Sequence, residues 1–138
     1  MARSITIAIP THNRAALLRG TLASLSGIKV AADSDLECII VDNASSDATA
    51  QVAESASGTL KFPVRHVFEP RLGSSFARNR AIDEARGELI CFIDDDVIVD
   101  SEWLSEMTAA IEGRGLDAAC GMVAPQFLTR PPAWLGTR

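Results

Sequence analysis

The feature that most constrains this chain is an apolar run that leads directly into three consecutive acids, at residues 88–97 (Glu-Leu-Ile-Cys-Phe-Ile-Asp-Asp-Asp-Val). An uninterrupted apolar run rich in β-formers predicts a central strand of a parallel sheet, covered on both faces. Asp94, Asp95 and Asp96 would then lie at its carboxyl end. Their carboxylates repel one another and resist desolvation, so a divalent cation that carries a phosphate is a natural partner. The alternative is a solvated acidic turn before the next helix.

Length and charge limit the function classes that remain. The 138 residues suffice for one domain, and the net charge of −5 argues against a nucleic-acid partner and a broad basic membrane surface. No apolar run approaches the ~20 residues of a membrane span, and no signal peptide pattern is present, so we expect a cytoplasmic chain. Cys38, Cys91 and Cys120 lie in apolar, strand-like runs without metal-type spacing, which predicts buried free thiols.

Strand and helix patterns alternate along the chain. Five strands are expected, over residues 4–9, 37–41, 64–68, 89–93 and 118–124. Such alternation predicts right-handed crossovers and a three-layer α/β/α fold with a mainly parallel central sheet. Arg65 and His66 interrupt the third run, which places that strand nearest the sheet edge. Pro10 should end the first strand, and Asn13 is a competent N-cap for the first helix.

Polar residues gather at the expected carboxyl ends of the strands. Residues 10–14 (Pro-Thr-His-Asn-Arg) follow the first strand, Asp42 and Asn43 follow the second, and residues 94–96 follow the fourth. The opposite ends of the strands carry nothing comparable. Because ligands of open α/β sheets bind beyond the carboxyl ends, this one-sided distribution favours a metal-and-ligand site over a solvated acidic turn.

Four short motifs occur at these positions in a fixed order. They are Pro-Thr-His-Asn-Arg at 10–14, Val-Asp-Asn-Ala-Ser-Ser-Asp-Ala-Thr at 41–49, Gly-Ser-Ser-Phe-Ala-Arg-Asn at 73–79 and the acid triplet at 94–96. Together they resemble the motifs of family-two glycosyltransferases of the GT-A fold, over about residues 5–124. The resemblance implies a Rossmann-like nucleotide-sugar-binding domain at residues 1–124. Residues 125–138 would form an extended segment leading to a missing acceptor-binding part.

The family resemblance also implies a set of site residues. Base and ribose would be held by the first two strand ends, and the diphosphate by Mn²⁺ or Mg²⁺ on the aspartates. Asp96 and Asp94 are the implied metal ligands, since both would face the ligand if the backbone stays extended. The implied nucleotide-binding residues are Pro10, Thr11, Asn13, Arg14, Asp42, Asn43, Arg78, Asp94 and Asp95.

Base recognition is the least determined of these roles. Thr11 and either Asp42 or its neighbour Asn43 would contact the base. Many relatives carry a second aspartate in place of Asn43. An aspartate only accepts from a base N–H, whereas an asparagine donates and accepts, so the sequence leaves the identity of the base open.

Several other residues have two interpretations. Arg78 either reaches a phosphate or is a solvated arginine on a helix, and Asp47 serves either its helix terminus or the ligand. His12 and His66 have no accompanying serine or cysteine motif, so we expect surface or hydrogen-bonded histidines. The apolar segment 131–135 either lines an acceptor pocket or packs against this domain or the next.

The implied reaction is inverting transfer of a sugar from a UDP- or dTDP-linked donor to an acceptor saccharide or lipid-linked saccharide, as in polysaccharide biosynthesis. Such transfer would take place in the cytoplasm or at the inner face of a membrane. The family places its catalytic base well downstream, and residues 118–138 contain no acid. We therefore expect the base beyond Arg138. The alternative is a nucleotide-binding module that never catalyses transfer.

Two further classes fit the motifs less well. A sugar nucleotidyltransferase would carry a loop rich in glycine and arginine after its first strand, where this chain has Pro-Thr-His-Asn-Arg. A phospho-acceptor receiver domain would carry acids after its first strand and a lysine near its last, and this sequence has neither.

Overall fold

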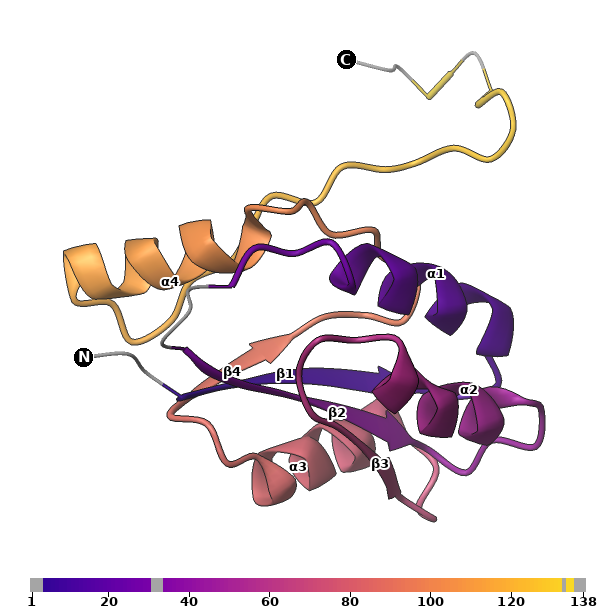
Figure 1. The fold of residues 1–138 in the computed structure, drawn as a ribbon. Coiled ribbons are helices and arrows are strands. Elements are labelled where there is room, and N and C mark those ends of the chain that lie inside the picture. The colour runs from indigo at the N-terminus through magenta and orange to yellow at the C-terminus, as the bar shows by residue number, and fades with distance from the viewer. Residues whose placement is uncertain (1–3, 31–33, 133, 136–138) are drawn as a thin grey trace.

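A computed structural model describes residues 4–30, 34–132 and 134–135, in which strands and helices alternate (Figure 1). The elements are β1 (Ser4–Thr11), α1 (Ala15–Leu25), β2 (Asp35–Asp42), α2 (Thr49–Ser55), the 3₁₀ turn η1 (Ala56–Gly58), β3 (Val64–Phe68), α3 (Ser74–Glu84), β4 (Leu89–Phe92) and α4 (Trp103–Arg114). None of the helices in this described part of the chain has the length and apolarity of a membrane span.

Four parallel strands form one sheet in the order β3-β2-β1-β4. Helices α1, α2 and α4 cover one face of this sheet and α3 covers the other (Figure 1). The structure thereby confirms the predicted three-layer α/β/α fold and the edge position of β3. The β1–β2 register ends with Thr11 opposite Asp42, so the loops after these two strands start side by side.

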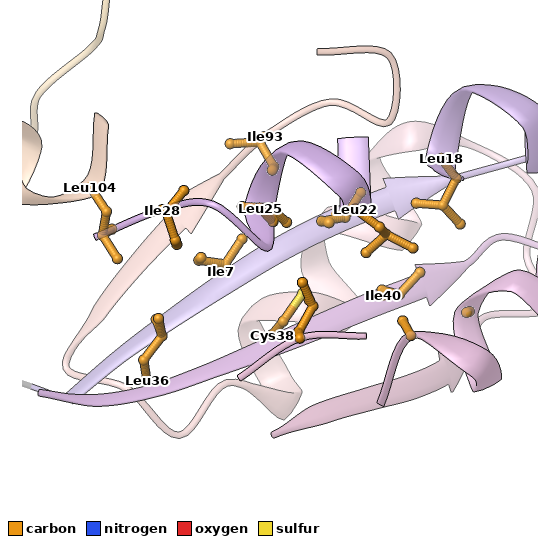
Figure 2. Packing of buried hydrophobic residues seen from close by; sticks show 14 of the residues in the cluster. Ile7, Leu18, Leu22, Leu25, Ile28, Leu36, Cys38, Ile40, Ile93 and Leu104 are labelled. Carbon is orange, nitrogen blue, oxygen red and sulfur yellow. The ribbon is translucent and has the colours of Figure 1, made fainter. Parts of the chain in front are cut away.

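Buried apolar side chains form one cluster on each face of the sheet. The larger cluster joins Ile7 of β1 and Ile40 of β2 to Leu22 of α1 (Figure 2). Fully burying a leucine or isoleucine contributes about 1.5–3 kcal/mol, so this cluster is the main source of stability. On the opposite face, Ala77 and Ala81 of α3 pack on the sheet, and their small size allows the close approach that the sequence predicts.

The prediction of a fifth strand at residues 118–124 is wrong. Residues 118–124 are exposed and pair with no strand in the described part of the chain. As a result β4 lies at the sheet edge instead of the centre. Its first three residues are only partly buried, and Phe92 is exposed. The apolar run at 118–124 has β propensity, but propensity forms a strand only where a neighbour supplies pairing and burial.

The cysteines divide according to this arrangement. Burial among apolar residues raises the pKa of Cys38 to about 12 and also raises the pKa of half-buried Cys91. Cys120 lies in the unpaired segment and is exposed, so its predicted burial is wrong. All three are free thiols, as expected.

β1 continues one residue past Pro10, although the sequence predicts a stop there. Alternate residues of a strand direct their backbone groups to alternate neighbours. The carbonyl of Ala8 accepts from Ile93 N on the β4 side, so Pro10 faces that same side. The β1–β4 pairing has already ended at Ala8, and the missing N–H of Pro10 therefore costs no ladder bond.

Gly87, just before β4, provides the first test of the fold. A Cβ at this position would lie 2.5 Å from Thr6 N and 2.7 Å from Ile5 C, which are backbone atoms of β1. Since β1 is fixed between two strands, we expect Gly87→Ala to lower the free energy of unfolding by about 1–3 kcal/mol in urea titrations. Gly113→Ala in α4 is the control, because its Cβ would meet nothing within 4 Å. The control should stabilise by about 0.5–1 kcal/mol, and an equal loss in both variants would contradict the packing.

Candidate functional site

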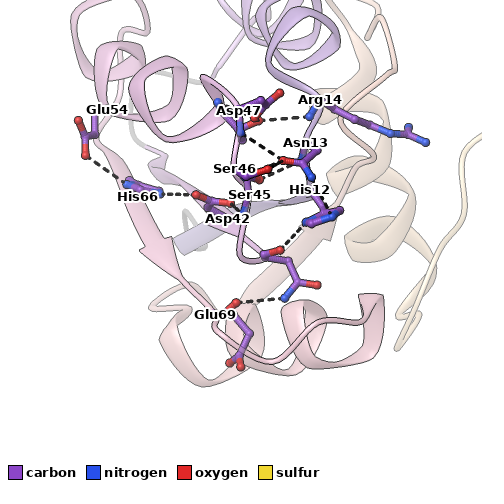
Figure 3. Close-up of polar contacts among 12 residues, drawn as sticks. His12, Asn13, Arg14, Asp42, Ser45, Ser46, Asp47, Glu54, His66 and Glu69 are labelled. Atoms are coloured by element: carbon purple, nitrogen blue, oxygen red, sulfur yellow. Dashed lines mark hydrogen bonds and ion pairs between the residues drawn. The ribbon is translucent and has the colours of Figure 1, made fainter.

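Asn13 ties the loop after β1 to the loop after β2 (Figure 3). Its Oδ1 accepts from Ser46 N at 2.7 Å and Asp47 N at 3.3 Å, and its own N–H donates to Ser45 Oγ at 2.9 Å. Asn13 adopts a positive φ of 52° and does not cap α1, contrary to the sequence prediction. The amide that begins α1, Ala15 N, donates instead to Asp47 Oδ2 at 3.2 Å.

Asp47 therefore serves the first turns of two helices. Besides its contact with Ala15 of α1, its Oδ1 accepts from Thr49 N at 2.9 Å at the start of α2. A negative charge at a helix N-terminus is favourable. The hydrogen bond from the Thr49 hydroxyl is the largest of the interactions that lower the pKa of Asp47. The structure thus gives Asp47 the helix-terminus role.

His12 bridges the ends of β1 and β2. Its Nδ1 lies 2.6 Å from the carbonyl oxygen of Asn43, and because a carbonyl only accepts, Nδ1 must carry the proton. Nε2 then accepts from Asn13 Nδ2 at 3.1 Å. This geometry places His12 in a hydrogen-bonded role between the two strand ends.

The side-chain amide of Asn43 is almost fully buried and holds the loop that follows β3. Its Nδ2 donates to the carbonyls of Glu69 at 3.1 Å and Arg71 at 2.7 Å, and its Oδ1 accepts from Gly73 N at 2.8 Å. Gly73 has a φ of 137°, a conformation that favours glycine. Both N–H donors of the amide are engaged, whereas Oδ1 can accept a second hydrogen bond. Asn43 can therefore offer a ligand only an acceptor.

Glu69 is a buried carboxylate in the same loop that the sequence prediction missed. Its Oε1 accepts from Arg71 Nε at 2.8 Å and from Arg71 N at 2.9 Å. The Arg71 side chain, followed by its backbone N–H, holds the pKa of Glu69 down at about 2. The available signal was an acid directly after a strand, at the carboxyl edge, with an arginine two residues later.

The three consecutive acids are paired with arginines from two other elements. Arg14, in the loop after β1, places Nη1 3.2 Å from Asp95 Oδ1 and 3.0 Å from Asp96 Oδ2. Arg78 of α3 places Nη2 3.1 Å from Asp94 Oδ1. Attraction to Asp95 and then Asp96 raises the pKa of Arg14.

The acids differ sharply in exposure. The side chains of Asp94 and Asp96 are 64% and 45% exposed, whereas that of Asp95 is 6% exposed. A turn forms at Asp95 and Asp96, yet the first and third acids still lie on the solvent side. Within the described ranges, no three His, Cys, Asp or Glu side chains converge as a closed metal site. A metal here would need further oxygen ligands from water or substrate.

Two buried residues complete the strand ends. Asp42 Oδ1 accepts from Ser45 N at 2.9 Å, and Oδ2 lies 3.6 Å from His66 Nε2. Thr11 is buried next to half-buried Pro10, and no residue in the described part of the chain hydrogen-bonds its hydroxyl. A buried hydroxyl without a partner is costly, so Thr11 is suited to receive a ligand group. The predicted site residues thus lie at the ends of β1, β2 and β4, with Arg78 joining from α3.

Known proteins resemble this chain in both sequence and structure. Succinoglycan biosynthesis protein ExoM of Rhizobium meliloti is 28% identical over 131 residues, which are 95% of this chain and 42% of ExoM. The mannosyltransferase PcManGT from Pyrobaculum calidifontis, in complex with GDP-Man and Mn²⁺, has a TM-score of 0.73 and 26% identity over 80% of this chain and 33% of its own. S. aureus TarS 1–349 in complex with UDP-GlcNAc has a TM-score of 0.67 and 25% identity over 91% of this chain and 37% of its own.

The chain therefore spans less than half the length of these relatives. A family model, described as glycosyl transferase family 2, matches residues 6–138. This match covers nearly the whole sequence, and the fold agrees with that of the solved glycosyltransferases. The chain belongs to glycosyl transferase family 2.

Proposed function

We propose that this chain is the donor-binding portion of an inverting glycosyltransferase that takes its sugar from a nucleoside diphosphate sugar. The observation that carries the proposal is the meeting of exposed acids and polar strand ends at one edge of a parallel sheet, in a family 2 chain. Similar proteins solved in complex with GDP-Man and Mn²⁺ and with UDP-GlcNAc support it.

Asp96 and Asp94 are the proposed ligands of Mn²⁺ or Mg²⁺. Both present exposed carboxylate oxygens, and Mg²⁺ is usually held by one or two carboxylates together with substrate phosphates. A site without a closed cluster of acids fits this mode of binding. Bound there, the ion would neutralise charge that builds on the diphosphate leaving group.

Thr11 and Asn43 are the proposed contacts to the base, and Asp42 supports the loop after β2 by accepting from Ser45 N. The Asn43 amide offers an acceptor only, which suits a ring N–H such as that of uracil or thymine and agrees with a UDP- or dTDP-linked donor. Thr11 contributes a buried hydroxyl that has no partner in the described residues. Arg14 and Arg78 supply positive charge on the diphosphate side.

The first prediction concerns metal-dependent binding. UDP at about 100 times its dissociation constant should stabilise the chain by about 2.7 kcal/mol in thermal-shift assays with Mn²⁺. Asp96→Asn should abolish this shift, and Asp95→Asn should reduce it less because the Asp95 side chain faces the protein. Asp117→Asn is the matched control, with the same charge change at an exposed position outside the site. Equal stabilisation by UDP in excess EDTA would refute the metal role.

The second prediction is that residues 1–138 alone do not transfer sugar to an acceptor saccharide or lipid-linked saccharide. Candidate bases outside the donor site are few. Glu102, Glu106 and Glu112 belong to α4 or its N-cap, which lies toward the amino-terminal side of the sheet (Figure 1). A competent base is worth about 10²- to 10⁴-fold in rate, and we place it beyond Arg138. Incubation with Mn²⁺, labelled nucleotide sugars and mixed acceptors should yield only slow donor hydrolysis. Acceptor-dependent product would show that the base lies within this chain.

A further inference from the structure

We propose that Arg14 makes binding of the divalent cation and binding of the donor depend on each other. In the ligand-free chain Arg14 pairs with Asp95 and Asp96. It releases Asp96 to the metal only when the diphosphate supplies a new anionic partner for the guanidinium. This inference rests on the proposed function, since it assumes that Asp96 and a diphosphate share the site.

A single nitrogen of Arg14 holds two of the acids. Nη1 lies 3.2 Å from Asp95 Oδ1 and 3.0 Å from Asp96 Oδ2. A metal ion bound to Asp96 would therefore compete with a guanidinium that already neutralises the same carboxylate. The carboxylate has two oxygens, so a metal ion could bind it beside Arg14, but the two cations would then repel each other. The Arg14–Asp96 contact therefore weakens metal binding to the ligand-free chain.

The environment of Arg14 allows this exchange. Its backbone is fixed, because Arg14 N donates to Thr49 Oγ1 at 3.2 Å and Arg14 O accepts from Leu18 N at 2.9 Å. The side chain of Arg14 is 49% exposed and that of Asp96 is 45% exposed, so their contact faces water. Exposed ion pairs of this kind contribute little to stability. Only the guanidinium has to move, and the fold does not.

Asp95 keeps Arg14 at the site during the exchange. Its side chain is 6% exposed, and among the described residues Arg14 is the cation paired with it, so losing Arg14 would leave a buried carboxylate uncompensated. Arg14 can therefore keep Asp95, release Asp96 and turn its remaining N–H donors toward the diphosphate. A guanidinium has five such donors in a planar fork, which suits phosphate oxygens.

Arg78 differs from Arg14 in a way that assigns the role. Among the three acids it contacts Asp94, through a hydrogen bond of 3.1 Å, and both partners are well exposed. Of the two arginines, Arg14 alone is anchored to a buried acid and also covers the acid proposed as principal metal ligand. Removing Arg14 should thus change how strongly the divalent cation and the donor affect each other's binding, and not only the affinity for each of them.

The test measures Mn²⁺ binding by calorimetry or by the EPR signal of free Mn²⁺, with and without UDP. We expect the unmodified chain to bind Mn²⁺ weakly alone and at least ~5-fold more tightly with UDP, which is the usual lower range of such coupling. Arg14→Gln should bind Mn²⁺ more tightly than the unmodified chain without UDP, and UDP should add little. Arg14→Lys, which keeps the charge, should retain weak binding. Arg19→Gln, an exposed arginine of α1, should behave as the unmodified chain.

Each outcome decides the inference. If Arg14→Gln binds Mn²⁺ no more tightly without UDP, or if UDP strengthens it as much as it strengthens the unmodified chain, Arg14 does not couple the ligands. In that case metal-dependent UDP binding by the unmodified chain would leave the proposed function standing. If the unmodified chain binds neither Mn²⁺ nor UDP, both proposals fail. Circular dichroism of each variant separates these results from misfolding, and Arg14→Lys tests the charge if Arg14→Gln does not fold.

Discussion

The parallel register that ends with Thr11 opposite Asp42 is the constraint on which the rest of this edge depends. Where two strands end side by side, the backbone N–H groups of the following loops lie close together and are no longer paired within the sheet. These N–H groups need other hydrogen-bond acceptors. Asn13 and Asp47 supply acceptors between the first two loops, and Asn43 supplies one to the third. Side chains that the family resemblance assigns to ligand binding therefore also hold the strand ends together.

The arginine pairs of the buried acids and those of the exposed acids differ in how much the fold depends on them. Asp95 and Glu69 are buried, and each is paired with a guanidinium, from Arg14 and Arg71 respectively. Removing the arginine would leave each buried carboxylate without its counter-charge, which is destabilising. Asp94 and Asp96 form exposed pairs, whose contribution to stability is small. The exposed acids can therefore exchange arginines for ligands at little cost to the fold.

Local patterns predicted most of the fold and the location of the site. Isoleucine alternation in β1 and the alanine face of α3 are signals that neighbouring residues carry, and the structure confirms both elements. The strand expected at residues 118–124 failed because pairing depends on a distant neighbour. The hydrogen bonds from Asn43 to the loop after β3 span 26 to 30 residues, and nothing in the spacing of the sequence predicts them.

The same long-range contacts explain what an asparagine does at position 43 that an aspartate would not. An aspartate at position 43 could still accept from Gly73 N, but it has no N–H to offer the carbonyls of Glu69 and Arg71. Those carbonyls would face a carboxylate instead, and oxygens that all carry negative charge would repel one another. With both amide protons committed to the loop, Asn43 presents the same acceptor chemistry as aspartate without the negative charge. The asparagine thus fits a loop built around Glu69 and Arg71 and keeps an acceptor for a base N–H.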